Sequence, residues 1–122
     1  MKIRTLRQLK RRALEKGKRI EAQFTGDLQT LFSRKKIKNY WKSKWHGELD
    51  KSGVDALVTR RDGTEIKVNV TTTNRKTVKR HRDINKKLGR TGILIWSHDE
   101  KPDRELRLRN LLRAVNGFNP QS

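Results

Sequence analysis

Residues 54–72 read VDALVTRRDGTEIKVNVTT and carry the clearest fold signal in the chain. Two β-rich runs, 54–59 and 64–72, are joined by an Arg-Asp-Gly segment at 61–63. Asp-Gly between such runs favours a tight hairpin turn, because glycine adopts a positive φ without steric cost. The second run alternates apolar and polar residues, which predicts a strand with one buried face. Its apolar members are Ile66, Val68 and Val70.

Helical periodicity precedes this hairpin. Apolar residues from Leu6 to Leu31 recur at spacings of three, four and seven, which is typical of a helix. Glycine weakens a helix, so we expect a break at Gly17 between a basic helix over 4–15 and a packed helix over 18–33. The stretch 37–45 alternates weakly and predicts a first strand, followed by a polar loop over 46–53.

A helix, a strand and a helix follow the hairpin. From residue 75 the pattern is helical, with Thr77, His81, Ile84 and Leu88 on one face and a stop at Gly89. The apolar run 92–96 is typical of a strand buried on both faces. A last helix opens at Pro102 and ends at Gly117.

The resulting order is helix, strand, strand, strand, helix, strand, helix. A helix between two strands favours a right-handed crossover, so the last strand should pair in parallel with the one before it. The sequence therefore predicts an α/β fold: a single-domain three-layer sandwich around a small mixed sheet. We expect a basic helical arm over 1–16, the α/β domain over 17–117 and a frayed tail over 118–122.

Composition narrows the function classes. The 122 residues include 32 Lys and Arg against 13 Asp and Glu, a formal charge of +19. The absence of cysteine excludes disulfides, thiolate metal sites and cysteine nucleophiles. No apolar run reaches the roughly 18 residues of a membrane span, and the first residues lack the apolar stretch of a signal peptide. The basic segments also lack the Trp/Phe/Leu-rich face of an interfacial helix. We therefore expect a soluble, cytoplasmic protein that does not bind membranes.

Two clusters hold much of the positive charge. Residues 2–19 hold nine basic residues against Glu15, and residues 75–90 hold eight against Asp83. Such clusters favour a polyanionic partner, because cations that neutralise phosphates release condensed counterions. The residues expected to contact nucleic acid are Lys10, Arg11, Arg12, Arg75, Lys76, Lys79, Arg80, Arg82, Lys86 and Lys87.

Three short motifs occur in a fixed order: GKRIE at 17–21, SGVDA at 52–56 and VNVTT at 68–72. Together with the element order, they resemble the PD-(D/E)XK nuclease superfamily, which includes restriction endonucleases and archaeal Holliday-junction resolvases. The resemblance spans about residues 16–97 and implies a restriction-endonuclease-like core (α-β-β-β-α-β-α). It also implies phosphodiester hydrolysis with Mg²⁺ or Mn²⁺, with DNA favoured over RNA as the partner.

The resemblance also implies roles for particular residues. Asp55 would be the principal metal ligand, and Asn69 and Glu21 would be auxiliary ligands. Lys67 would supply the charge that helps to position water. A double-strand cut by one domain with one site would require a homodimer.

The chain departs from the family pattern at the third motif. Asn69 stands in place of the family's acid, and Thr71 stands in place of its lysine. A second register would use Glu65 and Lys67, but the hairpin geometry puts Glu65 about 10–15 Å from Asp55. Two ligands of one Mg²⁺ cannot be that far apart. Lys67 is nearer to Asp55 and lies on the same face.

Other interpretations of these residues stay open. The chain would be a nuclease-fold DNA binder without activity if the departures abolish catalysis, or a non-enzymatic RNA-binding or ribosome-associated protein. Trp41 and Trp45 could stack on unpaired bases, although burial in so small a core is the favoured expectation. His46 is expected at the surface, His81 in the core, and His98 in local capping beside Asp99.

Overall fold

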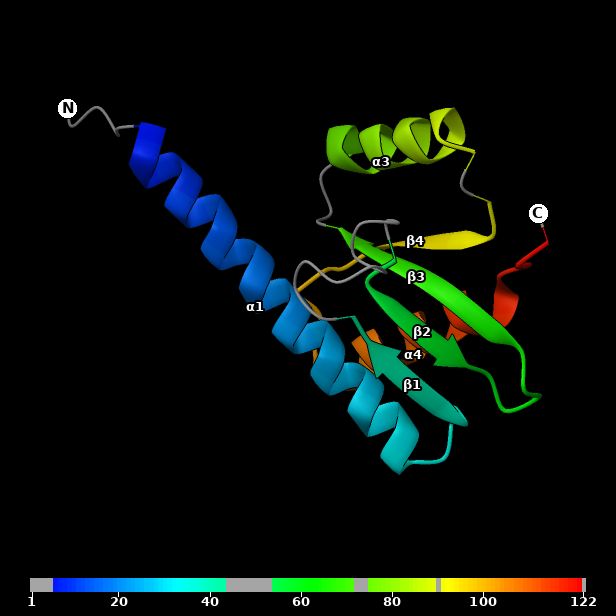
Figure 1. The fold of residues 1–122 in the computed structure, drawn as a ribbon. Helices are drawn as coiled ribbons and strands as arrows, with labels where there is room; N and C mark the ends of the chain where they lie inside the picture. Colours follow the sequence, from blue (N-terminus) through cyan, green and yellow to red (C-terminus); the bar gives the residue numbers. More distant parts are fainter. Residues whose placement is uncertain (1–5, 44–53, 72–74, 90, 122) are drawn as a thin grey trace.

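The chain has the predicted order of helices and strands (Figure 1). The computed structural model describes residues 6–43, 54–71, 75–89 and 91–121, with side chains from residue 15 in the first range and from residue 78 in the third. The elements are α1 (Leu6–Ser33), β1 (Asn39–Lys42), β2 (Ala56–Thr59), β3 (Glu65–Thr71), α3 (Arg75–Lys87), β4 (Ile93–Ser97) and α4 (Arg104–Gly117).

The four strands form one mixed sheet in the order β1-β2-β3-β4. The first two pairings are antiparallel, and β3 pairs in parallel with β4 across α3, as predicted. The predicted turn is confirmed: Gly63 has a φ of 91° and donates its N–H to the Arg60 carbonyl at 2.9 Å. The fold is therefore a small α/β fold with a mixed sheet.

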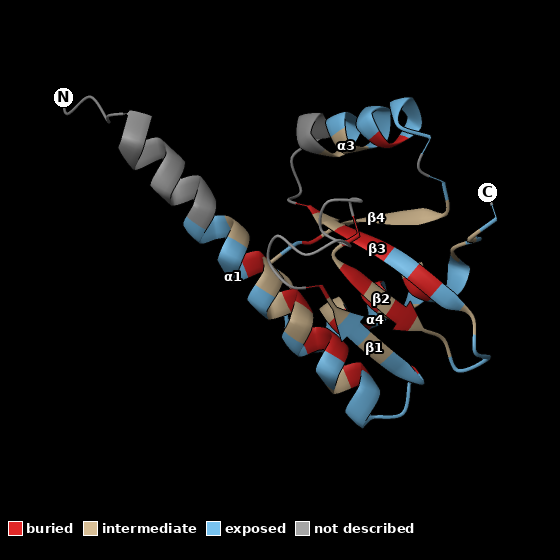
Figure 2. Ribbon diagram, viewed as in Figure 1, coloured by how far each residue is buried: buried red, intermediate tan, exposed pale blue. Residues whose placement is uncertain are grey.

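The hydrophobic core lies between one face of the sheet and helices α1 and α4. Alternation along β2 and β3 turns every second side chain toward this core. Figure 2 shows the buried residues along the second half of α1 and on the central strands. The fully buried core members include Phe24, Leu28, Ala56, Val58, Ile66, Val68, Leu111 and Val115.

The predicted break at Gly17 is wrong, because α1 runs without interruption from Leu6 to Ser33. A glycine inside a helix costs only about 1 kcal/mol relative to alanine. The good helix formers around it and the packing of Phe24, Leu28 and Leu31 outweigh that cost. The expected boundary between residues 16 and 17 thus falls inside one helix.

Burial on the β4 side is lower than predicted. Every residue of β4 is only partly buried, whereas the sequence predicts a strand buried on both faces. The predicted apolar face of α3 is also largely exposed, with Ile84 at 43% and Leu88 at 59% of their full exposure. The reason is that β4 lies at one edge of the described sheet and no described residue of α3 joins the core cluster.

The C-terminal residues are held against the domain, although the sequence predicts a frayed tail. The Arg60 guanidinium donates hydrogen bonds to the carbonyls of Val115 and Phe118, and Phe118 packs against the core. A Cβ at Gly92 would meet the Pro120 carbonyl oxygen at 2.5 Å, so the tail passes directly over that glycine.

The first strand, predicted over 37–45, is four residues long and ends at Lys42. The expected polar loop, with His46 and Trp45, lies outside the described residues. Within the described part of the chain, no helix combines the length and hydrophobicity that crossing a bilayer requires.

Candidate nucleic-acid interface

Asp55 and Asn69 lie next to each other where β2 begins. The Asp55 N–H donates to the Val68 carbonyl at 2.8 Å, and the Val70 N–H donates to Asp55 Oδ2 at 2.6 Å. Asp55 is therefore hydrogen-bonded to Val68 and Val70, the residues on both sides of Asn69. The register, which pairs Ala56 with Val68, agrees with this placement.

The side chains of Asp55 and Asn69 belong to the sheet face opposite the α1/α4 core. Ala56 and Val68 are fully buried in the core, so their neighbours along each strand turn the other way. We call this second surface the polar face. Asn69 is only 6% exposed although it lies on this face, so the sheet is covered at this point.

A row of three side chains crosses the polar face beside Asp55. Trp41 on β1 pairs with Leu57 on β2, and Leu57 pairs with Lys67 on β3. Trp41 is 46% exposed and Lys67 is exposed, so the favoured expectation that Trp41 is buried is wrong. Trp41 belongs to β1, which lies at one edge of the described sheet, and its side chain points away from the core. This row joins an aromatic ring to a cation on one surface.

Glu65 is distant from Asp55, as the sequence predicted. It pairs with Thr59, four residues along β2 from Asp55. At roughly 3.3 Å per residue, the two positions are about 13 Å apart along the strand. The literal Glu-x-Lys motif at 65–67 therefore does not supply a second carboxylate beside Asp55.

Glu21 lies beside a cation rather than beside Asp55 and Asn69. Its Oε1 lies 3.7 Å from Lys42 Nζ, and Lys42 pairs with Ala56 on the face that α1 covers. The structure thus brings Asp55, Asn69 and Lys67 onto the polar face, but it pairs Glu21 with a cation of the opposite face. Among the described residues, no group of three or more His, Cys, Asp and Glu side chains could hold a metal.

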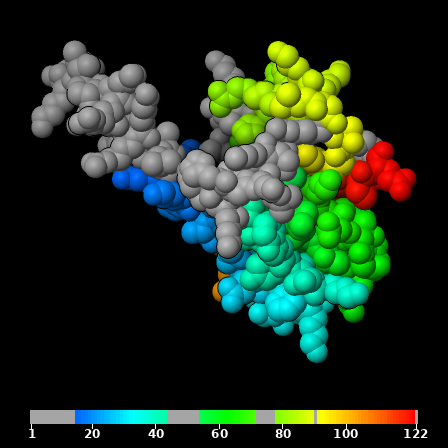
Figure 3. Space-filling view, viewed as in Figure 1, coloured from blue at the N-terminus to red at the C-terminus, as the bar shows by residue number. Residues whose placement is uncertain are grey.

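The predicted basic residues of α3 are at the surface. Lys79, Arg80, Arg82, Lys86 and Lys87 are all exposed, and Figure 3 shows the α3 residues at the surface in the upper part of the view. None of the four ion pairs found in the described chain involves α3. The side chains of Lys10, Arg11, Arg12, Arg75 and Lys76 lie outside the described part of the structure.

A buried polar network lies at the end of β4, where the sequence predicted only local capping by His98. The Trp96 indole N–H donates to His98 Nδ1 at 3.2 Å, and His98 Nε2 lies 2.7 Å from Gln23 Oε1. His98 is 2% exposed, and its burial lowers its pKa below the usual value. The ring is therefore neutral, with its hydrogen on Nε2 facing the glutamine. His81, by contrast, is half-buried on α3 and outside the core cluster, so its predicted core packing is wrong.

A buried ion pair adjoins this network. Asp27 on α1 accepts two hydrogen bonds from the Arg107 guanidinium of α4, at 3.1 and 3.2 Å. The Asp27 side chain is 3% exposed, and the Arg107 side chain is 14% exposed. Sequence reasoning missed this pair because its two members are 80 residues apart. The helical spacing from Phe24 to Leu31 was the available signal, because it places Asp27 on the buried side of α1.

The chain is thus a small mixed α/β protein with a polar, partly aromatic sheet face and a basic helix, α3. Comparison of the chain with protein-family models, with curated proteins and with solved structures found no match.

Proposed function

We propose that this chain binds nucleic acid, with DNA favoured over RNA, through its polar sheet face and the exposed cations of α3. One observation carries the proposal: Asp55 is fixed beside Asn69 on the same face as Lys67 and the exposed ring of Trp41. An aromatic ring stacks on bases, and lysine attracts phosphate. The formal charge of +19 supports a polyanionic partner.

We further propose that the domain has a restriction-endonuclease-like core and hydrolyses phosphodiester bonds with Mg²⁺ or Mn²⁺. The order of the elements and the antiparallel, antiparallel, parallel pairing of the sheet support this assignment. Asp55 and Asn69 would hold the metal, which would activate water and stabilise the leaving oxygen. Lys67 would balance charge beside them.

Few oxygen atoms at this position could bind a hard cation such as Mg²⁺. Oδ2 of Asp55 accepts the Val70 N–H, so the candidate ligands are Oδ1 of Asp55 and the side-chain carbonyl oxygen of Asn69. Mg²⁺ is commonly bound through one or two carboxylates, with water and substrate phosphate completing its shell. The substrate would therefore supply part of the coordination. Glu21 is the weaker candidate ligand because its neighbour is Lys42.

A nuclease-fold binder without activity is the second candidate. Asn69 and Thr71 replace the acid and the lysine of the family motif. Glu21, the second candidate carboxylate, lies beside Lys42 on the opposite face of the sheet. With fewer anionic ligands, a site binds a divalent cation more weakly.

The test uses Asp55→Asn, which removes the charge but keeps an oxygen that can accept the Val70 N–H. Asp62→Asn is the matched control: Asp62 is an exposed turn residue whose Oδ1 accepts the Thr64 N–H. Both variants and the wild type are incubated with linear duplex, branched and single-stranded DNA and with RNA, in Mg²⁺ or Mn²⁺. Binding is measured in parallel.

Metal-dependent cleavage by the wild type and Asp62→Asn, abolished in Asp55→Asn, is the expected result. If all three proteins bind in a salt-sensitive manner without cutting, the hydrolytic proposal fails and the binder remains. If the wild type binds no nucleic acid at physiological salt, both proposals are overturned.

A further inference from the structure

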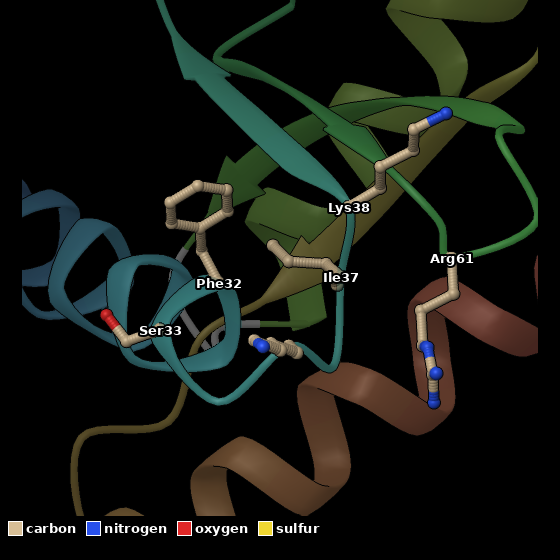
Figure 4. A pocket seen from close by; sticks show the side chains of 6 residues that line it. Phe32, Ser33, Ile37, Lys38 and Arg61 are labelled. Carbon is tan, nitrogen blue, oxygen red and sulfur yellow. The ribbon is translucent and has the colours of Figure 1, made fainter.

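A hollow of about 560 Å³ opens at the hairpin end of the sheet, away from Asp55. We call it the hairpin-end pocket. Figure 4 shows Phe32 on one side, Lys38 and Arg61 on the other, and Ile37 between them. Its lining residues are Phe32, Ser33, Lys35, Ile37, Lys38 and Arg61. A volume of this size lies in the range of small-ligand sites.

The apolar part of the pocket is held in place by the fold. Ile37 is 2% exposed and belongs to the core cluster, whereas Phe32 is 45% exposed. The Phe32 ring meets Tyr40 edge to face, with centroids 5.8 Å apart and planes at 70°. The ring is therefore supported on its Tyr40 side while nearly half of the residue faces solvent. A supported, open aromatic ring suits stacking by a planar base.

The rest of the lining is cationic. Lys35, Lys38 and Arg61 are exposed, and none of them takes part in an ion pair with another described residue. The carboxylate of the neighbouring acid, Asp62, accepts a hydrogen bond from the Thr64 N–H. This hydrogen bond lowers the pKa of Asp62. Three cations around an apolar hollow favour a ligand that is both aromatic and anionic.

The third cation of the lining, Lys35, is placed by the end of α1. Its φ of 59° is the only positive value among the described non-glycine residues. It lies two residues after Ser33, the last residue of α1, at the position where glycine or asparagine usually ends a helix. A lysine there costs stability that glycine would not. The Lys35 N–H donates to the Phe32 carbonyl and the Lys36 N–H donates to the Leu31 carbonyl, as at an ordinary helix end, and this helix end places the Lys35 side chain at the pocket.

We propose that the hairpin-end pocket takes one unpaired nucleotide of the bound nucleic acid. The base would stack on Phe32. Lys38 and Arg61 point in opposite directions in Figure 4, so they would meet the phosphates on either side of that base. This inference rests on the proposed function and deepens it, because it assigns single-stranded character to part of the substrate. Duplex DNA alone would leave the pocket unused.

The test compares binding to a blunt DNA duplex with binding to the same duplex carrying a short single-stranded overhang. The variants are Phe32→Ala and Lys35→Gly. The matched controls are Leu106→Ala, which truncates an apolar side chain of α4 that is 43% exposed, and Arg113→Gln, which removes an exposed cation of the same helix. Denaturant unfolding of every protein is measured alongside.

We expect the wild type and both controls to prefer the overhang substrate by about tenfold, within the range of one base–aromatic stack. Phe32→Ala and Lys35→Gly should lose that preference and retain blunt-duplex binding. Lys35→Gly should also unfold at a higher denaturant concentration than the wild type, which separates a loss of binding from a loss of folding.

Two results would overturn the inference while leaving the proposed function intact. One is a wild type that binds both substrates with equal affinity, and the other is an overhang preference that survives in both variants. A wild type that binds neither substrate would instead overturn the proposed function, and the inference with it.

Discussion

His98 illustrates how burial sets the behaviour of a single residue. Trp96 donates a hydrogen bond to its Nδ1, so protonation at that nitrogen would break this hydrogen bond. Burial is the main cause of the lowered pKa, and Arg107 adds to it, while Asp27, Glu100 and Asp99 oppose it. The neutral ring is thus the form that the folded state requires.

We expect the stability of the protein to fall on acidification below about pH 6.5, the pKa of an unfolded histidine. Below that pH the unfolded chain binds a proton that the folded His98 does not, until the lower folded pKa is reached. One histidine contributes a slope of at most about 1.4 kcal/mol per pH unit. Denaturant unfolding between pH 5 and 7.5 checks this.

His98→Gln should flatten that slope. Burial lowers the pKa of His81 too, so His81→Gln is measured alongside to separate the contributions of the two histidines to the slope. A pH dependence that is unchanged in His98→Gln would contradict the assignment.

The Asp27–Arg107 pair gives a second prediction at this scale. Arg107→Met should destabilise the fold by about 3–5 kcal/mol, because it leaves a buried carboxylate without its counter-charge. Replacing both partners, as Asp27→Leu with Arg107→Met, should recover most of that stability. Chemical denaturation of the single and double variants measures the coupling.

The exposed Arg34–Glu105 pair is the matched control. Its side chains are 40% and 63% exposed, so water screens the pair and Arg34→Met should destabilise the fold much less than Arg107→Met. Equal destabilisation by Arg107→Met and Arg34→Met would mean that burial adds nothing to the Asp27–Arg107 pair.

At the scale of the elements, α1 is a single helix in spite of its two internal glycines. A Cβ built at Gly17 meets no atom within 4 Å. Gly17→Ala should therefore stabilise the protein by about 0.5–1 kcal/mol, because alanine loses less backbone entropy in a helix. Urea unfolding, with helicity followed by circular dichroism, measures the gain.

Gly63→Ala is the contrasting variant. Gly63 has a φ of 91°, which an L-residue adopts only with strain, so alanine there should destabilise the fold by roughly 1–2 kcal/mol. A destabilising Gly17→Ala would imply that the helix is interrupted at residue 17 in solution.

The elements that could be predicted from sequence are those with local signals. The Asp-Gly turn and the alternation from Ile66 to Val70 specify the hairpin, and the spacing of apolar residues specifies α4. The exposure of Trp41 and the partial burial of β4 could not be predicted, because both depend on the place of a strand in the sheet. The placement of Asp55 beside Asn69 followed from the turn, whereas the Glu21–Lys42 contact joins a helix to a strand.

For the whole molecule, the net charge of +19 predicts strongly salt-dependent binding. Removing one cation that neutralises a phosphate should reduce the slope of log K against log salt by about 0.9 on duplex DNA. Replacing Lys86 and Lys87 together by glutamine should therefore reduce the slope by about 2. Titrations at several salt concentrations give the slope.

Lys101→Gln is the control for that experiment, because it removes an exposed cation outside α3. If the double variant kept the wild-type slope, α3 would not contact phosphates, and the polar face alone would account for binding.

The open sheet order has a consequence for solubility. Within the described residues, β1 and β4 are the two edge strands, and an edge strand is a template for pairing with another molecule. β1 ends in Lys42 and follows a lysine-rich segment, and such charges discourage edge pairing. β4 reads ILIWS and carries no charge of its own. The main protection of that edge is then the electrostatic repulsion between whole molecules, each with a net charge of +19. Salt screens this repulsion and a bound polyanion neutralises the charge, so both would promote self-association through β4.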